Sequence, residues 1–184
     1  MTTNSNVTRY AGGSLVLHWL MAVLIVAVYA LINLSDVFEK GSDARALTKY
    51  WHFSLGLTVF FLVWLRIVLR LMFPAPPIVP AMPVWQDKAA KLGHGLLYVL
   101  MVGMPLLGWL VLSAKGRAIP FYGLELPALI GADKPLSRQF MDLHELGGTV
   151  GYFLIGGHAA AALFHHYFTK DNTLLRMLPG RKAV

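Results

Sequence analysis

Four long apolar runs constrain this chain more than any other feature of its sequence. They cover residues 14–34, 48–72, 89–113 and 141–167. Each run has at least the roughly 20 residues that an α-helix needs to cross the hydrocarbon core of a bilayer. Lipid satisfies no backbone polar group, so spanning segments of this length fold as helices. The sequence therefore predicts an all-α membrane protein, a bundle of four transmembrane helices that forms a single domain over residues 1–184.

The composition supports a membrane location and excludes several other classes. Hydrophobic residues make up 57% of the 184 residues and charged residues only 14%, whereas a soluble domain has about 25% charged residues. The net charge is +7, but no basic–aromatic cluster accompanies it, so a nucleic-acid partner is not expected. The lack of cysteine excludes disulfides, thiolate metal sites and the covalent attachment of a c-type haem.

The links between the runs have their own signals. The Pro-rich stretch at 73–83 cannot continue a helix and is expected to run extended on the surface. Pro105 lies inside the third run, where it predicts a kink. The connection at 114–140 is long and partly apolar, and we interpret it as an element at the membrane interface rather than a free loop.

The distribution of positive charge predicts the orientation. Nine of the 16 Lys and Arg residues fall on the membrane side that holds both termini, and seven fall on the other side. Cytoplasmic segments have the excess of Lys and Arg in membrane proteins. This small excess predicts cytoplasmic termini.

Histidines within the apolar runs are the candidate functional residues, because a histidine in a membrane helix is costly and usually marks a site. His144 and His158 in the fourth run are 14 residues apart, which is about 21 Å along a helix and only about 40° around it. One helix face would thus present two imidazoles to two stacked haems. Without cysteine, such haems are b-type, held by histidine or methionine.

Because successive spans alternate in direction, position within a run converts to depth. Depth pairs His52 with His144, and it pairs His158 with either His18 or His94. A packing or interfacial histidine is the alternative for any one of these residues. If His94 is not a ligand, it could bond a haem propionate or a quinone. His165 and His166 lie at the helix end, where we interpret them as solvated interfacial residues.

Two arginines of the second run reach the depth of the lower histidine pair. Arg66 lies 14 residues beyond His52, and Arg70 follows after four more. Arg66 could pair with the carboxylates of a haem there, or it could snorkel to lipid phosphate. A quinone pocket could lie on the same side or beside the outer haem; the residues that could line it on the side of the termini are His94, Arg70, Trp85 and Lys91.

Several sequence pieces resemble the bacterial cytochrome b561 family, the small di-haem membrane cytochromes that include superoxide oxidases. The pieces are LHWLM at 17–21, YWHFSLGL at 50–57, RIVLRL with PAPPIVP at 66–80, LGHGLLY at 92–98, and GYFLIGGHAAAALFHHYFTKDNTLLRM at 151–177. The resemblance covers nearly the whole chain and is weakest in the connection at 114–140. It implies a bacterial inner-membrane protein with two haem b groups. The haem iron ligands that it implies are His18, His52, His144 and His158.

The resemblance also implies an activity in which superoxide reduces the cytochrome, oxygen is released and ubiquinone accepts the electrons. Superoxide is an anion, so a basic rim near the outer haem would raise its rate of encounter. The candidates for this rim, all in the third connection, are Lys115, Arg117, Lys134 and Arg138. Ordinary loop solvation is the alternative for each, and nearby acidic residues weaken the field.

Three functions remain open from the sequence. The first is an oxidoreductase that moves electrons between superoxide and ubiquinone and requires no obligate protein partner. The second is a cytochrome b relay subunit between quinone and a partner dehydrogenase or hydrogenase. The third is a haem-free structural or transport protein, which requires the histidine pattern to be accidental. No Ser/His/Asp or paired-carboxylate arrangement indicates hydrolytic chemistry.

Overall fold

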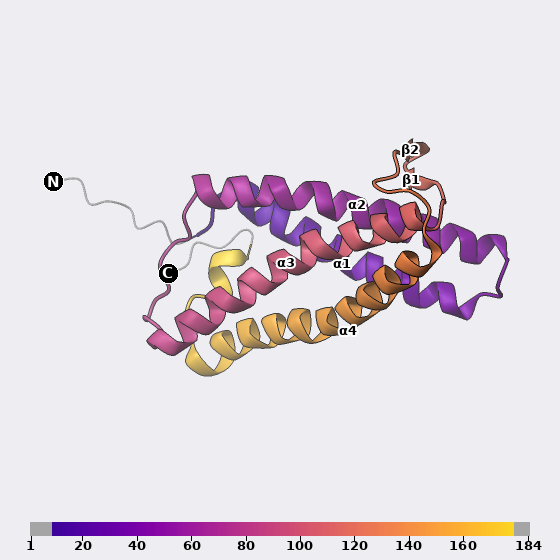
Figure 1. The fold of residues 1–184 in the computed structure, drawn as a ribbon. Coiled ribbons are helices and arrows are strands. Elements are labelled where there is room, and N and C mark those ends of the chain that lie inside the picture. The colour runs from indigo at the N-terminus through magenta and orange to yellow at the C-terminus, as the bar shows by residue number, and fades with distance from the viewer. Residues whose placement is uncertain (1–8, 179–184) are drawn as a thin grey trace.

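The computed structural model describes residues 9–178. Four long helices dominate it, with a small hairpin between the third and fourth helices and two short helical turns after the fourth (Figure 1). In order the elements are α1 Gly12–Val37, α2 Asp43–Met72, α3 Val84–Ala114, β1 Ile119–Phe121, β2 Leu124–Leu126, α4 Lys134–Phe164, the π-helical turn η1 His165–Thr169 and the 3-10 turn η2 Leu175–Met177. The prediction of a four-helix membrane bundle is confirmed.

All four helices begin earlier than hydropathy alone predicted, and polar caps extend two of them, α2 and α4. The Ser42 hydroxyl accepts from the Arg45 backbone N–H at 3.3 Å and starts α2. The Asp133 carboxylate accepts from the Leu136 N–H at 2.9 Å and starts α4, seven residues before the predicted start at 141. Such caps satisfy backbone donors that a helix leaves free in its first turn. α2 and α4 therefore each have a capped first turn outside the apolar stretch.

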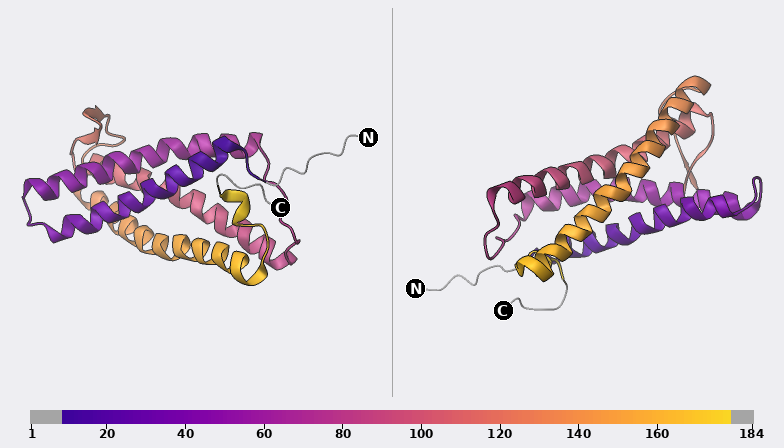
Figure 2. Two further views of the ribbon diagram at one scale, coloured as in Figure 1. Left: turned by 180° about the vertical axis from the view of Figure 1, so that it is seen from behind. Right: turned by 90° about the horizontal axis from the view of Figure 1, so that it is seen from below.

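The four helices form two hairpins, α1–α2 and α3–α4, that meet through α2 and α3 (Figures 1 and 2). A buried cluster joins α1 to α2 and α3 near the described chain ends. It consists of Leu17, Met21, Val59 and Val63, with Tyr98, Met101 and Val102 packed against it. All four helices are long and apolar enough to cross a membrane. Large apolar side chains on their outer faces, such as Leu71 and Phe153, are mostly exposed, as lipid-facing residues are.

The third connection is an ordered hairpin and a shorter one than predicted, since α4 already begins at Lys134. Tyr122 and Gly123 both have positive φ angles of 49° and 83°, as the two central residues of a type I′ turn require. The hairpin packs back on α2, where the Tyr50 hydroxyl accepts from the Gly123 N–H at 2.9 Å. It lies beside α2 in the half of the bundle that is farther from the described chain ends (Figure 1).

The segment after α4 folds back and ties three parts of the molecule together. The Trp19 indole donates to the Met177 carbonyl at 2.7 Å, which attaches the segment to α1. The Val79 N–H donates to Asn172 Oδ1 at 2.9 Å, and the Asn172 N–H donates to the Val79 carbonyl at 3.0 Å. These two bonds attach the segment to the Pro-rich link. The Tyr10 N–H donates to the Arg176 carbonyl at 3.4 Å, so the two described chain ends lie together.

Candidate functional site

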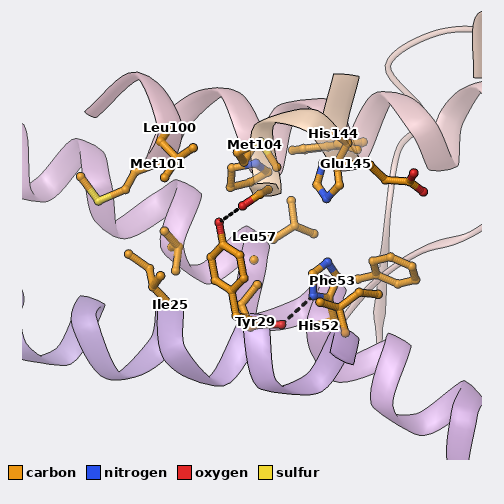
Figure 3. A pocket seen from close by; sticks show the side chains of 18 of the residues that line it. Ile25, Tyr29, His52, Phe53, Leu57, Leu100, Met101, Met104, His144 and Glu145 are labelled. Atoms are coloured by element: carbon orange, nitrogen blue, oxygen red, sulfur yellow. Dashed lines mark hydrogen bonds between the residues drawn. The ribbon is translucent and has the colours of Figure 1, made fainter. Parts of the chain in front are cut away.

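A cavity of about 630 Å³ lies between the four helices in the half of the bundle next to the hairpin. Its walls are mostly apolar, with Ile25, Leu57 and Met104 among them. His52 on α2 and His144 on α4 face each other across it (Figure 3). The structure thus brings together the first pair that depth predicted, hereafter the upper pair.

The surroundings of the upper pair orient both rings. His52 Nδ1 lies 2.9 Å from the Val28 carbonyl oxygen, which can only accept, so Nδ1 holds the proton and Nε2 keeps its lone pair. His144 Nδ1 is buried without a hydrogen-bond partner among the described residues. Gly108 leaves room for this ring, because a Cβ there would stand 3.4 Å from His144 Cε1. A metal-bound histidine typically donates its second ring N–H to an acceptor, as His52 Nδ1–H does to the Val28 carbonyl.

The two upper rings are spaced as one metal ion between them requires. Their centres are 6.2 Å apart and their planes are inclined by 81°. Metal–imidazole bonds of about 2.0 Å on opposite sides of one ion place the ring centres roughly 6 Å apart. No group of three or more His, Asp or Glu residues able to hold a metal occurs within residues 9–178. Two opposed histidines and a mostly apolar cavity suit a haem, whose macrocycle supplies the other iron ligands.

His18 on α1 and His158 on α4, hereafter the lower pair, have the same geometry. Their ring centres are 6.3 Å apart and their planes are inclined by 78°. His94, the other candidate partner of His158, has its ring centre only 5.3 Å away, which is too short for two opposed metal bonds of about 2.0 Å. The spacing therefore favours His18. Within the continuous helix α4, His144 and His158 separate the two levels by about 21 Å.

Arg66 on α2 points toward the lower pair rather than the lipid surface. Its Nη2 lies 3.1 Å from His18 Nδ1, and its Nη1 is buried with no hydrogen-bond partner among the described residues. A guanidinium can only donate, so His18 Nδ1 accepts in this arrangement and the proton sits on Nε2. An iron bond at Nε2 would therefore require Arg66 to turn away and donate to another acceptor.

The residues suggested for a quinone pocket on the side of the termini lie in separate contacts. The Arg70 guanidinium stands 5.2 Å over the Tyr10 ring. Lys91 pairs with Asp87 at 2.7 Å, and Trp85 is 68% exposed. A quinone site at this position stays a prediction.

Basic residues lie close in the chain to residues that line the upper cavity, whose own charged lining residues are the acidic Asp36 and Glu145. Lys115 and Arg117 follow α3 between Leu112 and Ile119, both of which line the cavity. Burial lowers the pKa of Lys115, the charges of Arg117 and Lys49 lower it further, and Glu145 raises it. The pKa of Lys115 thus responds to two positive charges and one carboxylate. The sequence interpretation missed Lys49, although it lies three residues before His52 and hence at the same end of α2.

The other two rim candidates are not in the connection, which corrects the prediction. Lys134 and Arg138 belong to the first two turns of α4, because the Asp133 cap starts the helix there. The Asp133 N–H donates to the Ala114 carbonyl at 2.9 Å. This bond keeps Lys134 close to the end of α3, and Arg138 follows one turn later on an exposed face.

The interpretation of His165 as a solvated interfacial residue is wrong. Its Nδ1 pairs with Asp171, and its side chain is only 13% exposed. The αL conformation of Lys170, with φ of 56°, turns the chain so that Asp171 returns to His165. His166 is half-buried beside Tyr167.

Polar side chains close the seam between α1 and α4 beside the upper cavity. The Tyr29 hydroxyl donates to the Gly148 carbonyl at 2.9 Å (Figure 3). The Asn33 amide donates to the Tyr152 hydroxyl at 2.7 Å, and the rings of Tyr29 and Tyr152 lie 4.5 Å apart. The sequence interpretation missed these residues, because a Tyr or Asn in an apolar run gives no sign of which helix it meets.

Comparison with known proteins identifies the family of the chain. Residues 9–180 match the family described as prokaryotic cytochrome b561. The chain is 37% identical to cytochrome b561 homolog 1 of Escherichia coli (strain K12) over 95% of its own length and 99% of the relative. It is 34% identical to a Yersinia pestis protein named probable superoxide oxidase CybB, over 95% and 98% of the two chains. It is also 30% identical to cytochrome b561 homolog 2 of Escherichia coli (strain K12), over 97% and 95%. The chain therefore belongs to the prokaryotic cytochrome b561 family, whose members are multi-pass membrane cytochromes that bind haem b and transfer electrons.

Proposed function

We propose that this membrane cytochrome holds two haem b groups and moves electrons from superoxide to ubiquinone. The observation that supports this most is the matched spacing of two imidazole pairs, 6.2 Å in the upper pair and 6.3 Å in the lower pair, at two levels of one bundle. A helical rise of about 1.5 Å per residue separates the levels by about 21 Å. Two such sites in line form a route across most of the bilayer core.

Three of the four helices would supply the iron ligands: α1, α2 and α4. His52 and His144 would ligate the upper haem, and His18 and His158 the lower haem. The bound irons supply one-electron chemistry, so that two superoxide anions become two oxygen molecules while ubiquinone takes two electrons and two protons to become ubiquinol. The Val28 carbonyl holds His52 in the tautomer with a free Nε2 lone pair. Its contact with the Nδ1–H also increases the basicity of the ligating nitrogen.

Arg66 would serve the lower haem by changing partners. In this structure it donates to His18 Nδ1 and keeps Nη1 buried and unpaired. A haem propionate is an acceptor that suits both free donors of the guanidinium. We infer that haem loading draws Arg66 from His18 to a propionate, which frees His18 to bind iron through Nε2.

The basic residues at the upper cavity would attract superoxide. Lys49, Lys115 and Arg117 lie close enough together to lower the pKa of Lys115. Lys134 and Arg138 extend the same positive field along the first turns of α4. A local excess of positive charge raises the local concentration and on-rate of an anion, although Asp36 and Glu145, which line the cavity, weaken this field. Similarity to a relative named probable superoxide oxidase supports this choice of donor.

The test is the rate at which superoxide reduces the purified cytochrome in stopped flow. Lys115→Gln/Arg117→Gln should lower the second-order rate constant several-fold and make it less sensitive to salt, because exposed charges are screened by salt. Lys88→Gln, an exposed lysine at the other end of the bundle, should leave both unchanged. Reduction only in the presence of a co-purifying redox subunit would contradict the proposal and favour the relay function.

A further inference from the structure

Two arginines from separate parts of the chain stand against the ring of Tyr10, at the end of the bundle that holds the described chain ends. The Arg70 guanidinium at the end of α2 lies 5.2 Å over the Tyr10 ring. The Arg176 guanidinium of η2 lies 5.5 Å from the same ring centre. Arg9 precedes Tyr10 directly in the chain. We call Arg9, Arg70 and Arg176 the arginine cluster.

The arginine cluster has buried donors that no described residue satisfies. Arg176 is 5% exposed; it donates to the Pro76 carbonyl, yet its Nε is buried and unpaired within residues 9–178. Arg9 Nε and Nη2 are also buried, and no residue within 9–178 accepts a hydrogen bond from them. Buried guanidinium donors without acceptors are costly. Their arrangement indicates an acceptor that none of the residues 9–178 provides.

Nearby carboxylates do not neutralise the cluster. The Asp171 carboxylate pairs with His165 and accepts a hydrogen bond from the Thr173 N–H at 2.8 Å. Asp87 is paired with Lys91. Burial lowers the pKa of Arg176 and the Arg70 charge lowers it further, while Tyr10 and Asp171 oppose this shift. The cluster therefore keeps a net positive charge, and an anion would stabilise it.

A cavity of about 550 Å³ adjoins the cluster, and Arg9 is the member of the cluster that lines it. The rest of its lining is mostly apolar and includes Tyr10, Phe73 and, from the link, Pro74, Pro76 and Pro77. It lies where α1 begins and α2 ends, so it stands at the level at which the spans leave the hydrocarbon core. A ligand there would meet the Arg9 guanidinium and apolar surface, with Arg70 and Arg176 on the neighbouring Tyr10 ring.

We propose that the arginine cluster binds the phosphate group of an anionic phospholipid, with the glycerol and upper acyl chain against Phe73 and the prolines. Arginine presents paired donors that match phosphate oxygens, and basic pockets between membrane helices bind anionic headgroups. The cluster is separate from Arg66, which lies four residues before Arg70, about 6 Å deeper along α2, and contacts His18. The bound lipid would tie the start of α1, the link and the η2 turn together.

The test uses the full haem-loaded protein in nanodiscs and in native mass spectrometry. The wild type should retain one phosphatidylglycerol molecule and be stabilised by several degrees in phosphatidylglycerol relative to phosphatidylcholine. Arg9→Gln should lose most of the bound lipid and of this stabilisation; Arg9 makes no side-chain hydrogen bond among the described residues, so the fold should persist. Arg176→Gln should behave in the same way or more severely. Lys88→Gln, an exposed charge on the same membrane side, should match the wild type.

Three results would overturn the proposal. Equal retention of phosphatidylglycerol by the wild type and Arg9→Gln would remove the cluster from lipid binding. Full stabilisation of detergent-solubilised protein by inorganic phosphate alone would make this an ion site rather than a lipid site. Loss of a haem in Arg9→Gln, seen as a lower haem-to-protein ratio with lipid content unchanged, would identify the acceptor as a propionate.

Discussion

Replacing Gly151 with alanine is expected to open the seam between α1 and α4. A Cβ on Gly151 would overlap the Tyr29 hydroxyl and stand 3.2 and 3.4 Å from the two Leu100 methyl carbons. Overpacking of this kind costs about 1–3 kcal/mol. Displacing Tyr29 also breaks its bond to the Gly148 carbonyl, which is worth about 0.6 kcal/mol in a typical membrane helix pair.

Alanine has an opposing benefit, because it is about 0.8–1.0 kcal/mol better than glycine inside a helix. The net loss for Gly151→Ala is then about 1–3 kcal/mol, and each kcal/mol corresponds to about 2–4 °C in a chain of this length. Thermal unfolding in detergent, followed by circular dichroism, measures the change. Gly103→Ala is the matched control, since a Cβ at Gly103 meets nothing within 4 Å; this variant should be neutral or slightly more stable.

A second substitution makes the reasoning refutable. Tyr29→Phe removes the hydroxyl that the new methyl would overlap, so Gly151→Ala/Tyr29→Phe should unfold at a higher temperature than Gly151→Ala alone. The coupling between the two sites should be about 1–2 kcal/mol in the stabilising direction, within the range seen for residues in contact. Simple additivity of the two changes, or equal behaviour of Gly151→Ala and Gly103→Ala, would refute the account of the seam.

Two further predictions concern the lower end of the bundle. Arg66→Gln removes the donor beside His18 and should lower the occupancy of one haem several-fold in a haem-to-protein assay, whereas Arg66→Lys should recover part of it; full occupancy in Arg66→Gln would contradict the assigned role. Burial raises the pKa of Asp171, but the hydrogen bonds from His165 and Thr173 outweigh this effect and hold it below its ordinary value of 3.8. The carboxylate therefore stabilises the fold at pH values above 3.8 and loses this contribution as the pH falls through the lowered pKa. Asp171→Asn should thus increase hydrogen exchange in residues 170–178 near neutral pH and differ little from the wild type in strong acid; an unchanged exchange rate at neutral pH would count against the pair.

The fold was predictable because two features of the sequence are strong: the length of its apolar runs and the alternating direction of successive spans. Apolar runs of spanning length require helices in lipid, and alternating span direction converts position into depth. Depth alone brought His52 to the level of His144, and the structure has their rings across one cavity. The resemblance of the motif around His158 to a known family pointed to the same residues.

The remaining features depend on how each helix is oriented about its own axis and on polar caps. Depth could not choose between His18 and His94 as partners of His158, because that choice depends on which faces α1 and α3 turn toward α4. The donation from His52 to the Val28 carbonyl also depends on packing, since a backbone group has no sequence signature. The start of α4 was misjudged because hydropathy does not register the Asp133 cap.

The most direct test of the central claim is the haem-to-protein ratio with reduced-minus-oxidised spectra. Two b-type haems per chain are predicted for the wild type, and one each for His52→Ala and His158→Ala, because each variant removes one ligand from one pair. His94→Ala should keep both haems, since its ring lies too close to His158 for an opposed iron bond. A single haem in the wild type, or two retained in His52→Ala, would contradict the two-site account.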